Sequence, residues 1–319
     1  MTPLAAAGHA QLGVLDALAA ERGIVLTHDA PLAPLTTLRV GGAADRLVAV
    51  HTRAALLAAL GLARDAGCPC FLLGNGSDLV VSDAGMRGLV IRNRARAVAV
   101  EGEALTADAG APMALLVRTA TTAGLAGLEF GTSIPGTLGG AVWANAGAHG
   151  REMRDVVVTV EVWDPGDGAS STLAGEACSF GYRESRFKHG QEVVIGATLA
   201  LERDERAAIA ARVAAHQAQR VATQPLAAQN AGSVFRNPPG DHAGRLIDAA
   251  GLKGLRIGGA SVSERHANFI VTDRDARAAD VRALGDRVRD EVRAQTGIEL
   301  DYEIEFVGDW PAAPPGGRR

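Results

Sequence analysis

The chain has 319 residues, of which 47% are hydrophobic and 21% are charged, and its net charge is −4. This length predicts two domains with ample interior to bury. The slightly acidic balance offers no basic patch for nucleic acid or for an anionic membrane surface.

Residues 1–31 are predicted to form an N-terminal extension with one short helix. Leu12, Leu15 and Leu18 recur at helical spacing and mark one face of that helix. The segment lacks a basic flank, and polar residues interrupt its apolar part. It therefore resembles neither a signal peptide nor a membrane span.

The next stretch reads as an α/β unit. A strand is predicted at residues 46–50, and Thr52 is the expected N-cap of a helix that runs through Ala66. A second strand, at residues 70–73, leads into the tight polar turn Gly74–Leu79. A strand, a helix, a strand and a glycine turn in this order are typical of units that bind a ligand at their strand ends.

The middle of the chain predicts more strands and one further helix. The helix runs from Pro112 to about Ala123, with Gly124 as its stop. The strands are expected at residues 89–92, 97–100, 156–163 and 193–201.

The segment from Gly124 to Gly150 is far richer in glycine than a core element should be. Small polar residues stand among these glycines, so backbone N–H groups and hydroxyls are presented together. Such turns can bind a phosphate or another anionic, flat ligand. The alternative is a run of tight turns without a ligand.

Neither glycine turn completes a dinucleotide fingerprint. Gly74–Gly76 and Gly136–Gly140 both lack the spacing G-x-G-x-x-G, and no G-x-x-x-x-G-K-[ST] occurs. Any nucleotide cofactor must therefore be held by a different architecture.

The C-terminal part predicts a smaller α+β domain. Helices are expected at residues 202–222, 243–250 and 276–296, and strands at 267–271 and 300–307. Within the last strand, Asp301, Glu303 and Glu305 would share one face, which is either solvated or covered by a pocket that raises the pKa of a buried member. The tail from residue 309 to 319 is expected to be disordered.

Two segments between these elements could carry chemistry. In residues 180–187, Arg183 could hold a carboxylate through two parallel N–H bonds, or it could be a solvated arginine beside Glu184. In residues 230–238, Ser233 lacks the pattern of a hydrolase nucleophile. It could donate a proton, or simply serve as a turn or cap residue.

The cysteines and histidines suggest no metal site. Cys68, Cys70 and Cys178 fit neither a disulfide framework nor a zinc site, and the histidines lack metal-ligand spacing. We expect small buried thiols in a reducing compartment and hence a cytoplasmic protein.

Seven blocks in order make the chain resemble the UDP-N-acetylenolpyruvoylglucosamine reductases of peptidoglycan synthesis. The blocks are TTLRVGG from Thr36, LGNGSDLV from Leu73, GTSIPGTLGGAVWANAGAHG from Gly131, FGYRESRF from Phe180, NAGSVFRNP from Asn230, AGRLIDAAGLKGLRIGGASVSERHANFIV from Ala243, and LDYEIEFVG from Leu300. Each block alone is weak evidence for this family, but the seven blocks in order are specific to it.

The resemblance implies an α+β fold with a vanillyl-alcohol-oxidase, or PCMH-type, FAD-binding domain of two α/β subdomains. A smaller α+β substrate-binding domain follows. We place the FAD domain at residues 32–203, divided near residue 100, and the substrate domain at residues 204–308. The implied reaction uses NADPH to reduce FAD, and hydride from flavin N5 then reduces the enolpyruvyl ether of the UDP-sugar to give UDP-N-acetylmuramate.

The resemblance also implies residue roles. Arg183 and Glu303 would stabilise charge on the substrate carboxylate, and Ser233 would protonate the carbanion. Contacts to the substrate are implied for Tyr182, Arg220, Asn237, Lys253 and His266. Contacts to FAD are implied for Thr37, Arg39, Gly41, Gly42, Gly74, Asn75, Gly76, Ser77, Asp78, Leu79, Gly110, Ser133, Ile134, Pro135, Gly136, Thr137, Gly139 and Gly140.

Some features narrow the resemblance. The segment from Arg183 to Ser233 is short, as in the subclass without an inserted tyrosine loop, and Arg236 stands where lysine is common. We expect a monomer whose partners are the UDP-sugar and NADPH. The alternatives are another PCMH-type FAD oxidoreductase acting on a sugar or hydroxy acid, and a non-enzymatic nucleotide-sugar binding protein.

Overall fold

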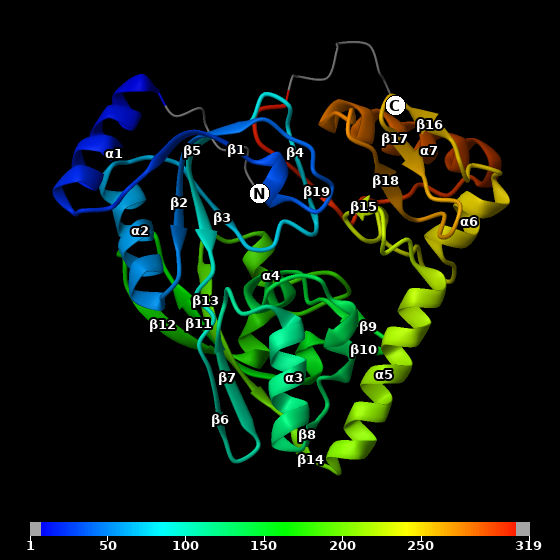
Figure 1. The fold of residues 1–319 in the computed structure, drawn as a ribbon, viewed down its shortest axis with the longest axis horizontal. Helices are drawn as coiled ribbons and strands as arrows, with labels where there is room; N and C mark the ends of the chain where they lie inside the picture. Colours follow the sequence, from blue (N-terminus) through cyan, green and yellow to red (C-terminus); the bar gives the residue numbers. More distant parts are fainter. Residues whose placement is uncertain (1–7, 311–319) are drawn as a thin grey trace.

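The structure, a computed structural model, describes residues 8–310 and arranges them as three lobes (Figure 1). The first lobe (residues 9–93) has a sheet of order β1-β2-β5-β3, in which β2, β5 and β3 are parallel. Its elements are α1 (His9–Glu21), β1 (Thr27–Pro31), β2 (Ala43–Val50), α2 (Arg53–Asp65), β3 (Cys70–Leu73), β4 (Leu79–Val81) and β5 (Met86–Asn93).

The predicted elements of the first lobe are confirmed. Thr52 is the N-cap of α2, and its Oγ1 accepts a hydrogen bond from the Ala55 N–H at 3.1 Å. The buried face of α2 packs with Leu15 of α1 and with the sheet in one apolar cluster. Because the three parallel strands end at one edge, the Gly74–Leu79 turn after β3 lies at that edge.

The second lobe (residues 98–203) is an antiparallel sheet of order β12-β11-β13-β7-β6 with two helices packed on it. Helix α3 follows Pro112 and ends at Gly124, whose φ of 68° is left-handed, as the sequence predicted. The pattern did not identify β7. The elements are β6 (Val98–Glu101), β7 (Ala104–Asp108), α3 (Met113–Ala123), β8 (Leu125–Ala126), α4 (Leu138–Trp143), β9 (Gly147–Ala148), β10 (Arg151–Glu152), β11 (Val157–Trp163), β12 (Ser170–Ala174), β13 (Val193–Ala200) and β14 (Glu202–Arg203).

The third lobe (residues 206–304) is reached through the long helix α5, which runs along the second lobe (Figure 1). Helices α6 and α7 cover a small sheet of order β15-β18-β17-β16. The elements are α5 (Arg206–Thr223), β15 (Gln229–Asn230), α6 (Ala243–Ala249), β16 (Arg256–Ile257), β17 (Ala260–Val262), β18 (Ile270–Thr272) and α7 (Ala278–Thr296).

Three predicted elements need correction. Helix α5 begins at Arg206, because Glu202 and Arg203 instead extend and pair with β8. The strand predicted at residues 267–271 is only Ile270–Thr272. The strand predicted at residues 300–307 is only β19 (Glu305–Val307).

The end of the chain returns to the first lobe. Strand β19 pairs in parallel with β4, and Ser82 Oγ donates a hydrogen bond to the Asp309 carbonyl at 2.7 Å. The third lobe also shares an apolar cluster with Leu38, Val40 and Val80 of the first lobe. The predicted disordered tail lies, from residue 311 onward, outside the described residues.

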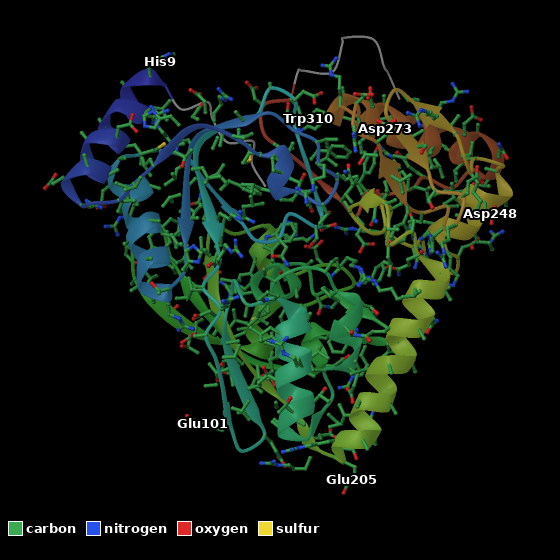
Figure 2. The ribbon with its side chains drawn as sticks, viewed as in Figure 1. His9, Glu101, Glu205, Asp248, Asp273 and Trp310 are labelled. Atoms are coloured by element: carbon green, nitrogen blue, oxygen red, sulfur yellow. The ribbon has the colours of Figure 1, made fainter. Side chains whose placement is uncertain are left out.

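The three cysteines are free thiols, of which Cys68 and Cys178 are buried, as expected, and Cys70 is only partly buried. None of the helices between residues 8 and 310 combines the length and the apolar character that crossing a membrane requires. The labelled acidic side chains Glu101, Glu205 and Asp248 lie at the periphery of the molecule (Figure 2).

Candidate active site

Arg183 stands at the tip of a two-residue turn. The backbone groups of Gly181 and Glu184 exchange hydrogen bonds of 2.9 and 3.1 Å, which leaves Tyr182 and Arg183 between them. Arg183 has a left-handed φ of 56°, a conformation that costs energy for a residue with a side chain. The surrounding structure must therefore hold this turn.

The end of helix α4 holds the turn. Asn145 is fully buried, and its Nδ2 donates a hydrogen bond of 2.7 Å to the Gly181 carbonyl. Ser185 Oγ donates to the Trp143 carbonyl at 2.6 Å, and Trp143 Nε1 donates to the Phe187 carbonyl at 3.1 Å. The Arg183 turn is thus fixed to the glycine-rich segment on both sides.

Ser233 and Glu303 lie on adjacent segments of the third lobe. Phe235 and Tyr302 form an isolated antiparallel bridge, and the Glu303 N–H donates to the Val234 carbonyl at 2.8 Å. Ser233 immediately precedes Val234, so its backbone lies beside the Glu303 segment.

Asn268, which is buried, fixes this segment with both ends of its amide group. Its Nδ2 donates to the Phe235 carbonyl at 2.8 Å, and its Oδ1 accepts from the Phe235 N–H at 3.0 Å. The sequence reasoning missed this role, although Asn268 stands within the HANFIV block.

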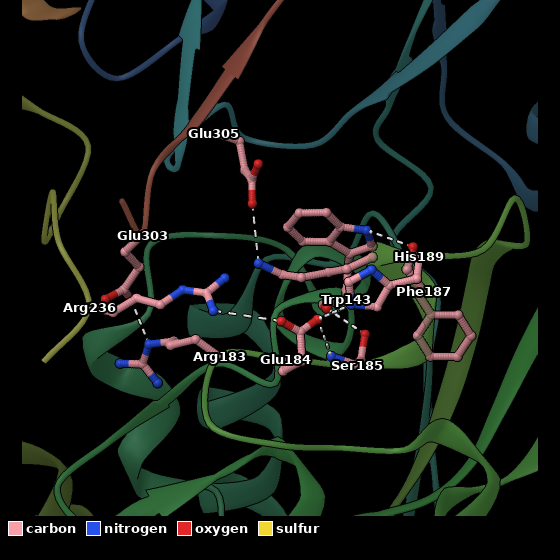
Figure 3. Close-up of polar contacts among 10 residues, drawn as sticks. Trp143, Arg183, Glu184, Ser185, Phe187, His189, Arg236, Glu303 and Glu305 are labelled. Carbon is pink, nitrogen blue, oxygen red and sulfur yellow. Dashed lines mark hydrogen bonds and ion pairs between the residues drawn. The ribbon is translucent and has the colours of Figure 1, made fainter. Parts of the chain in front are cut away.

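The structure brings Arg183 and Glu303 into direct contact, 120 residues apart in the sequence. Arg183 Nε donates to Glu303 Oε1 at 2.5 Å, and Nη2 donates to the Gly147 carbonyl at 3.0 Å (Figure 3). Only 21% of the Arg183 side chain and 18% of the Glu303 side chain are exposed. In this environment a charge-assisted pair is stronger than in water.

A second charged pair lies beside the first and was not predicted. Lys188 is 7% exposed, its Nζ lies 3.2 Å from Glu305 Oε1, and it stands 4.3 Å from the centre of the Trp143 ring. Only the block FKH, next to the Arg183 turn, could have drawn attention to it.

Asp78 connects this charged region to the glycine turn after β3. Its backbone carbonyl accepts a hydrogen bond from the Glu305 N–H at 2.9 Å. The residue is partly buried. Burial, with the charges of Glu303 and Glu305, raises its pKa well above 3.8, against the opposing pull of Lys188.

The two glycine-rich turns face each other between the first and second lobes. Asn75 Nδ2 donates to the Pro135 carbonyl at 2.9 Å, and a Cβ on Gly74 would lie 2.7 Å from Thr137 Oγ1. Within residues 8–310, no acceptor takes the backbone N–H groups of residues 75–77. Two close turns with free N–H groups form a cradle of the kind that binds phosphate.

The segment before β2 packs against the same turn. Both the N–H and the Oγ1 of Thr37 contact the Gly76 carbonyl, at 3.0 and 3.3 Å. The Arg39 side chain turns back to the Pro34 carbonyl, at 2.9 Å. Pro34, Thr37, Arg39 and Asn75 help to line an open pocket of about 410 Å³.

Other predicted flavin contacts are explained at least in part by close packing. A Cβ on Gly41 would lie 2.7 Å from Val81 Cβ, and one on Gly110 would lie 2.6 Å from the Ala95 carbonyl. A Cβ on Gly42 would strike the Asp83 carbonyl. Glycine is needed at these positions whether or not a ligand is near.

The second turn is tied to α5 through a pair of histidines. Ser133 Oγ lies 2.9 Å from His149 Nε2, and the His149 ring stacks on His216 with 3.8 Å between ring centres. Burial and the neighbouring His216 lower the pKa of His149. Gly139 donates its N–H to the Ala109 carbonyl at 2.8 Å, which places the start of α4 beside this turn.

Two of the predicted substrate contacts join the Arg183 turn. The Asn237 N–H donates to Tyr182 Oη at 3.3 Å, and Asn237 Oδ1 accepts from the Ala243 N–H at 3.1 Å. Arg220 lies on α5, where Nη1 reaches the Thr132 carbonyl at 3.5 Å. It therefore faces the second glycine turn.

Lys253 and His266 lie on the third lobe, and none of their recorded contacts reaches Arg183 or Glu303. Lys253 Nζ pairs with Asp248 at 2.8 Å, while Asp248 is on the outer edge of the lobe (Figure 2). Burial, with the nearby charge of Lys253, lowers the pKa of His266.

Two further observations concern a pocket and possible metal ligands. The larger pocket, about 670 Å³, is lined by residues of the first and second lobes, among them His51, Arg53 and Arg96, and contains none of the predicted site residues. Among the residues that the structure describes, no three His, Cys, Asp or Glu side chains gather as metal ligands.

Comparisons with known proteins agree with this geometry. A family model described as an FAD binding domain matches residues 44–173, and the C-terminal domain of UDP-N-acetylenolpyruvoylglucosamine reductase matches residues 224–307. The fold and the facing glycine turns therefore define an FAD-binding protein of the PCMH, or vanillyl-alcohol-oxidase, type.

Relatives define the family more narrowly. UDP-N-acetylenolpyruvoylglucosamine reductase from Moorella thermoacetica is 48% identical, covering 89% of this chain and 94% of the relative. UDP-N-acetylenolpyruvoylglucosamine reductase 2 from Symbiobacterium thermophilum is 46% identical over 89% of this chain and 93% of its own length. The crystal structure of MurB from Thermus caldophilus matches with a TM-score of 0.76 and 39% identity, over 89% of this chain and 98% of that one. The chain belongs to the UDP-N-acetylenolpyruvoylglucosamine reductase family.

The residues present fit FAD. Glycine at position 74 lets the two turns approach, and the N–H groups of residues 75–77 remain available to a diphosphate. The absence of a G-x-G-x-x-G fingerprint agrees with this class, because its members do not have the Rossmann phosphate loop that the fingerprint marks.

Proposed function

We propose that this protein reduces UDP-N-acetylenolpyruvoylglucosamine to UDP-N-acetylmuramate, with FAD as cofactor and NADPH as reductant, in peptidoglycan precursor synthesis. The observation that carries the proposal is the 2.5 Å contact between Arg183 and Glu303, beside the segment that bears Ser233. Family membership over 89% of the chain supports it.

We assign the cofactor to the two glycine turns, with the N–H groups of residues 75–77 on its diphosphate. Thr37, Ser77 and residues 133–140 complete this face. When bound, FAD supplies the hydride, taken from NADPH, that adds to the vinyl methylene carbon of the substrate.

Arg183 binds the substrate carboxylate in this proposal. A guanidinium has five N–H donors, and two of those of Arg183 already bind Glu303 and Gly147. The remaining donors are fixed in direction and can hold the carboxylate as negative charge develops on it. Fixed donors of this kind lower the barrier because they need no reorganisation.

Ser233 delivers the proton that completes the reduction. Its hydroxyl donates to the carbon next to the carboxylate, so that hydride and proton together saturate the double bond. The Asn268 amide and the Val234–Glu303 hydrogen bond fix the backbone that carries this hydroxyl. An acid that is held in place beside the reacting carbon lowers the activation free energy of the proton transfer.

Tyr182 and Asn237 are the substrate contacts nearest this centre, and Arg220 is assigned to the UDP-bearing part. Lys253 and His266 are assigned more distant contacts that need closure of the third lobe. We further propose a cytoplasmic monomer without nucleic-acid or membrane partners.

The test is turnover by the purified protein. We expect a yellow protein that oxidises NADPH continuously only when the enolpyruvyl sugar is supplied. Colourless protein without flavin would contradict the proposal. Flavin-bearing protein that reacts with a simple sugar or a hydroxy acid, and not with the enolpyruvyl sugar, would establish the alternative oxidoreductase instead.

A further inference from the structure

Among the described residues, the guanidinium of Arg236 is held only by a long ion pair. Its side chain is 29% exposed, yet its Nε is buried and has no hydrogen-bond partner. The acid recorded nearest to it is Glu184, at 3.6 Å from Nη1, which is longer than a hydrogen bond. Between residues 8 and 310, no hydrogen bond from this side chain is recorded.

Arg183 provides the contrast. Its Nε donates to Glu303 at 2.5 Å and its Nη2 to Gly147, so this guanidinium is anchored by two acceptors. Figure 3 shows both arginines beside Glu184 and Glu303, although Arg183 and Arg236 come from segments in different lobes.

Glu184 is not free to satisfy Arg236. Its Oε1 lies 2.9 Å from His189 Nε2 and accepts the Ser185 N–H at 3.3 Å. One carboxylate is thus shared among several donors, and Arg236 receives only its more distant oxygen. An arginine keeps its charge, and 29% of this side chain is exposed, so an anionic ligand could reach the exposed part and supply the acceptor that the protein lacks.

The position of Arg236 indicates which anionic group it would bind. Arg236 follows Ser233 by three residues. The backbone N–H of Arg236 donates to the carbonyl of Asp301 at 2.8 Å, and Asp301 lies two residues before Glu303. The same backbone ladder therefore carries Arg236, the proposed proton donor and the acid of the Arg183 pair. The proposed function places the reacting part of the substrate, which bears the carboxylate, at Ser233 and Arg183, so Arg236 lies nearer to that part than to the diphosphate in this proposal.

We propose that Arg236 is a second carboxylate-binding residue, and that it holds the enolpyruvyl carboxylate together with Arg183. The inference rests on the proposed function. It adds Arg236 to the residues that bind the substrate, and it explains why a guanidinium without a hydrogen-bond acceptor lies next to an anchored one.

A comparison of two ligands shows whether Arg236 binds the carboxylate or the diphosphate. UDP-N-acetylmuramate and UDP-N-acetylglucosamine share the diphosphate, but only the first carries the carboxylate. Their dissociation constants are measured by titration calorimetry on the FAD-bound protein, for the wild type and for Arg236→Met, Arg236→Lys and Arg256→Met. Arg256 is the matched control, because it is an exposed arginine of the same lobe that pairs with Asp273.

We expect Arg236→Met to weaken binding of UDP-N-acetylmuramate by roughly 10- to 100-fold, the usual loss for a hydrogen bond to a charged group. Binding of UDP-N-acetylglucosamine should stay within about 2-fold, because the diphosphate contacts are untouched. Arg236→Lys should keep part of the affinity through its charge, and Arg256→Met should change neither ligand.

Equal weakening for both ligands would place Arg236 at the diphosphate and overturn the inference, as would no weakening for either. Unfolding midpoints and flavin content of the variants show whether each variant is folded. If Arg236→Met does not fold, the affinities of Arg236→Lys for the two ligands provide the test. Failure of the wild type to bind UDP-N-acetylmuramate would instead refute the proposed function itself.

Discussion

The two faces of the candidate site are built from different materials. The cofactor face consists of backbone, in the turns at residues 74–79 and 133–140, which come together because glycine leaves room. The opposite face consists of charged side chains: Arg183 and Lys188 come from one segment, and Glu303 comes from a distant part of the chain. The first face should be sensitive to added atoms and the second to removed charge or hydroxyl.

The largest effect is expected from Ser233→Ala, on the side-chain face, and concerns the rate of flavin reoxidation. Reduction of the flavin by NADPH should stay nearly unchanged, because that step needs no proton from Ser233. Reoxidation by the enolpyruvyl sugar should slow by roughly 10²- to 10⁴-fold, the usual worth of general acid catalysis. Stopped-flow absorbance separates the two steps, and equal slowing of both would remove Ser233 from the proton-donor role.

On the cofactor face, Gly76→Ala should cost both stability and flavin. Gly76 and Gly102 have nearly the same left-handed φ, 61° and 62°, but a Cβ on Gly76 would lie 2.5 Å from the Leu35 carbonyl, while nothing lies within 4 Å of one on Gly102. Each variant should lose about 1–2 kcal/mol from backbone conformation alone.

Gly76→Ala should lose more than this, and its purified flavin content should fall. Urea unfolding and the ratio of flavin to protein absorbance measure both effects. If Gly102→Ala loses flavin to the same extent, the contact with the turn is not what holds the cofactor.

A smaller effect is expected from Lys188→Met. This change leaves Glu305 without its partner and removes the contact with the Trp143 ring, so the free energy of unfolding should fall by about 1–3 kcal/mol. Arg186→Met breaks the more exposed pair with Glu192 and should cost below about 1 kcal/mol. Denaturant unfolding measures both, and equal losses would show that the Lys188 pair has no special weight.

The last prediction concerns the pH dependence of stability that Asp78 introduces. Because its folded pKa is raised above 3.8, the folded state holds this proton more tightly than the unfolded state. Asp78 therefore lowers stability progressively as pH rises from 3.8 to the folded pKa, and the loss is complete above it.

Asp78→Asn should remove this dependence. The variant's advantage in unfolding free energy should grow as pH rises over that window and then reach a plateau. Unfolding curves from pH 4 upward give the difference. An advantage that does not change with pH would mean that the Asp78 carboxyl is not buried as described.

Local signals in the sequence predicted the ends of two helices and the positions of the glycine turns. Thr52 caps α2 and Gly124 ends α3, because both act through their own backbone within a few residues. The glycine turns were also recognisable, since tight turns and close approaches need glycine wherever the fold later places them.

The other face depends on contacts that sequence spacing does not contain. The segment at residues 300–307 alternates like one strand, yet only Glu305–Val307 finds a partner, β4 of the first lobe. Glu202 and Arg203 extend rather than begin α5 because β8 is there to pair with them. The Lys188–Glu305 pair likewise exists only once the chain has returned to the first lobe.

The most direct test of the whole account is an anaerobic stopped-flow experiment on the two half-reactions of the wild type. NADPH should bleach the bound flavin, and the enolpyruvyl sugar, added after NADPH is consumed, should restore the oxidised spectrum with formation of UDP-N-acetylmuramate. A flavin that NADPH reduces but that the sugar leaves reduced would contradict the account.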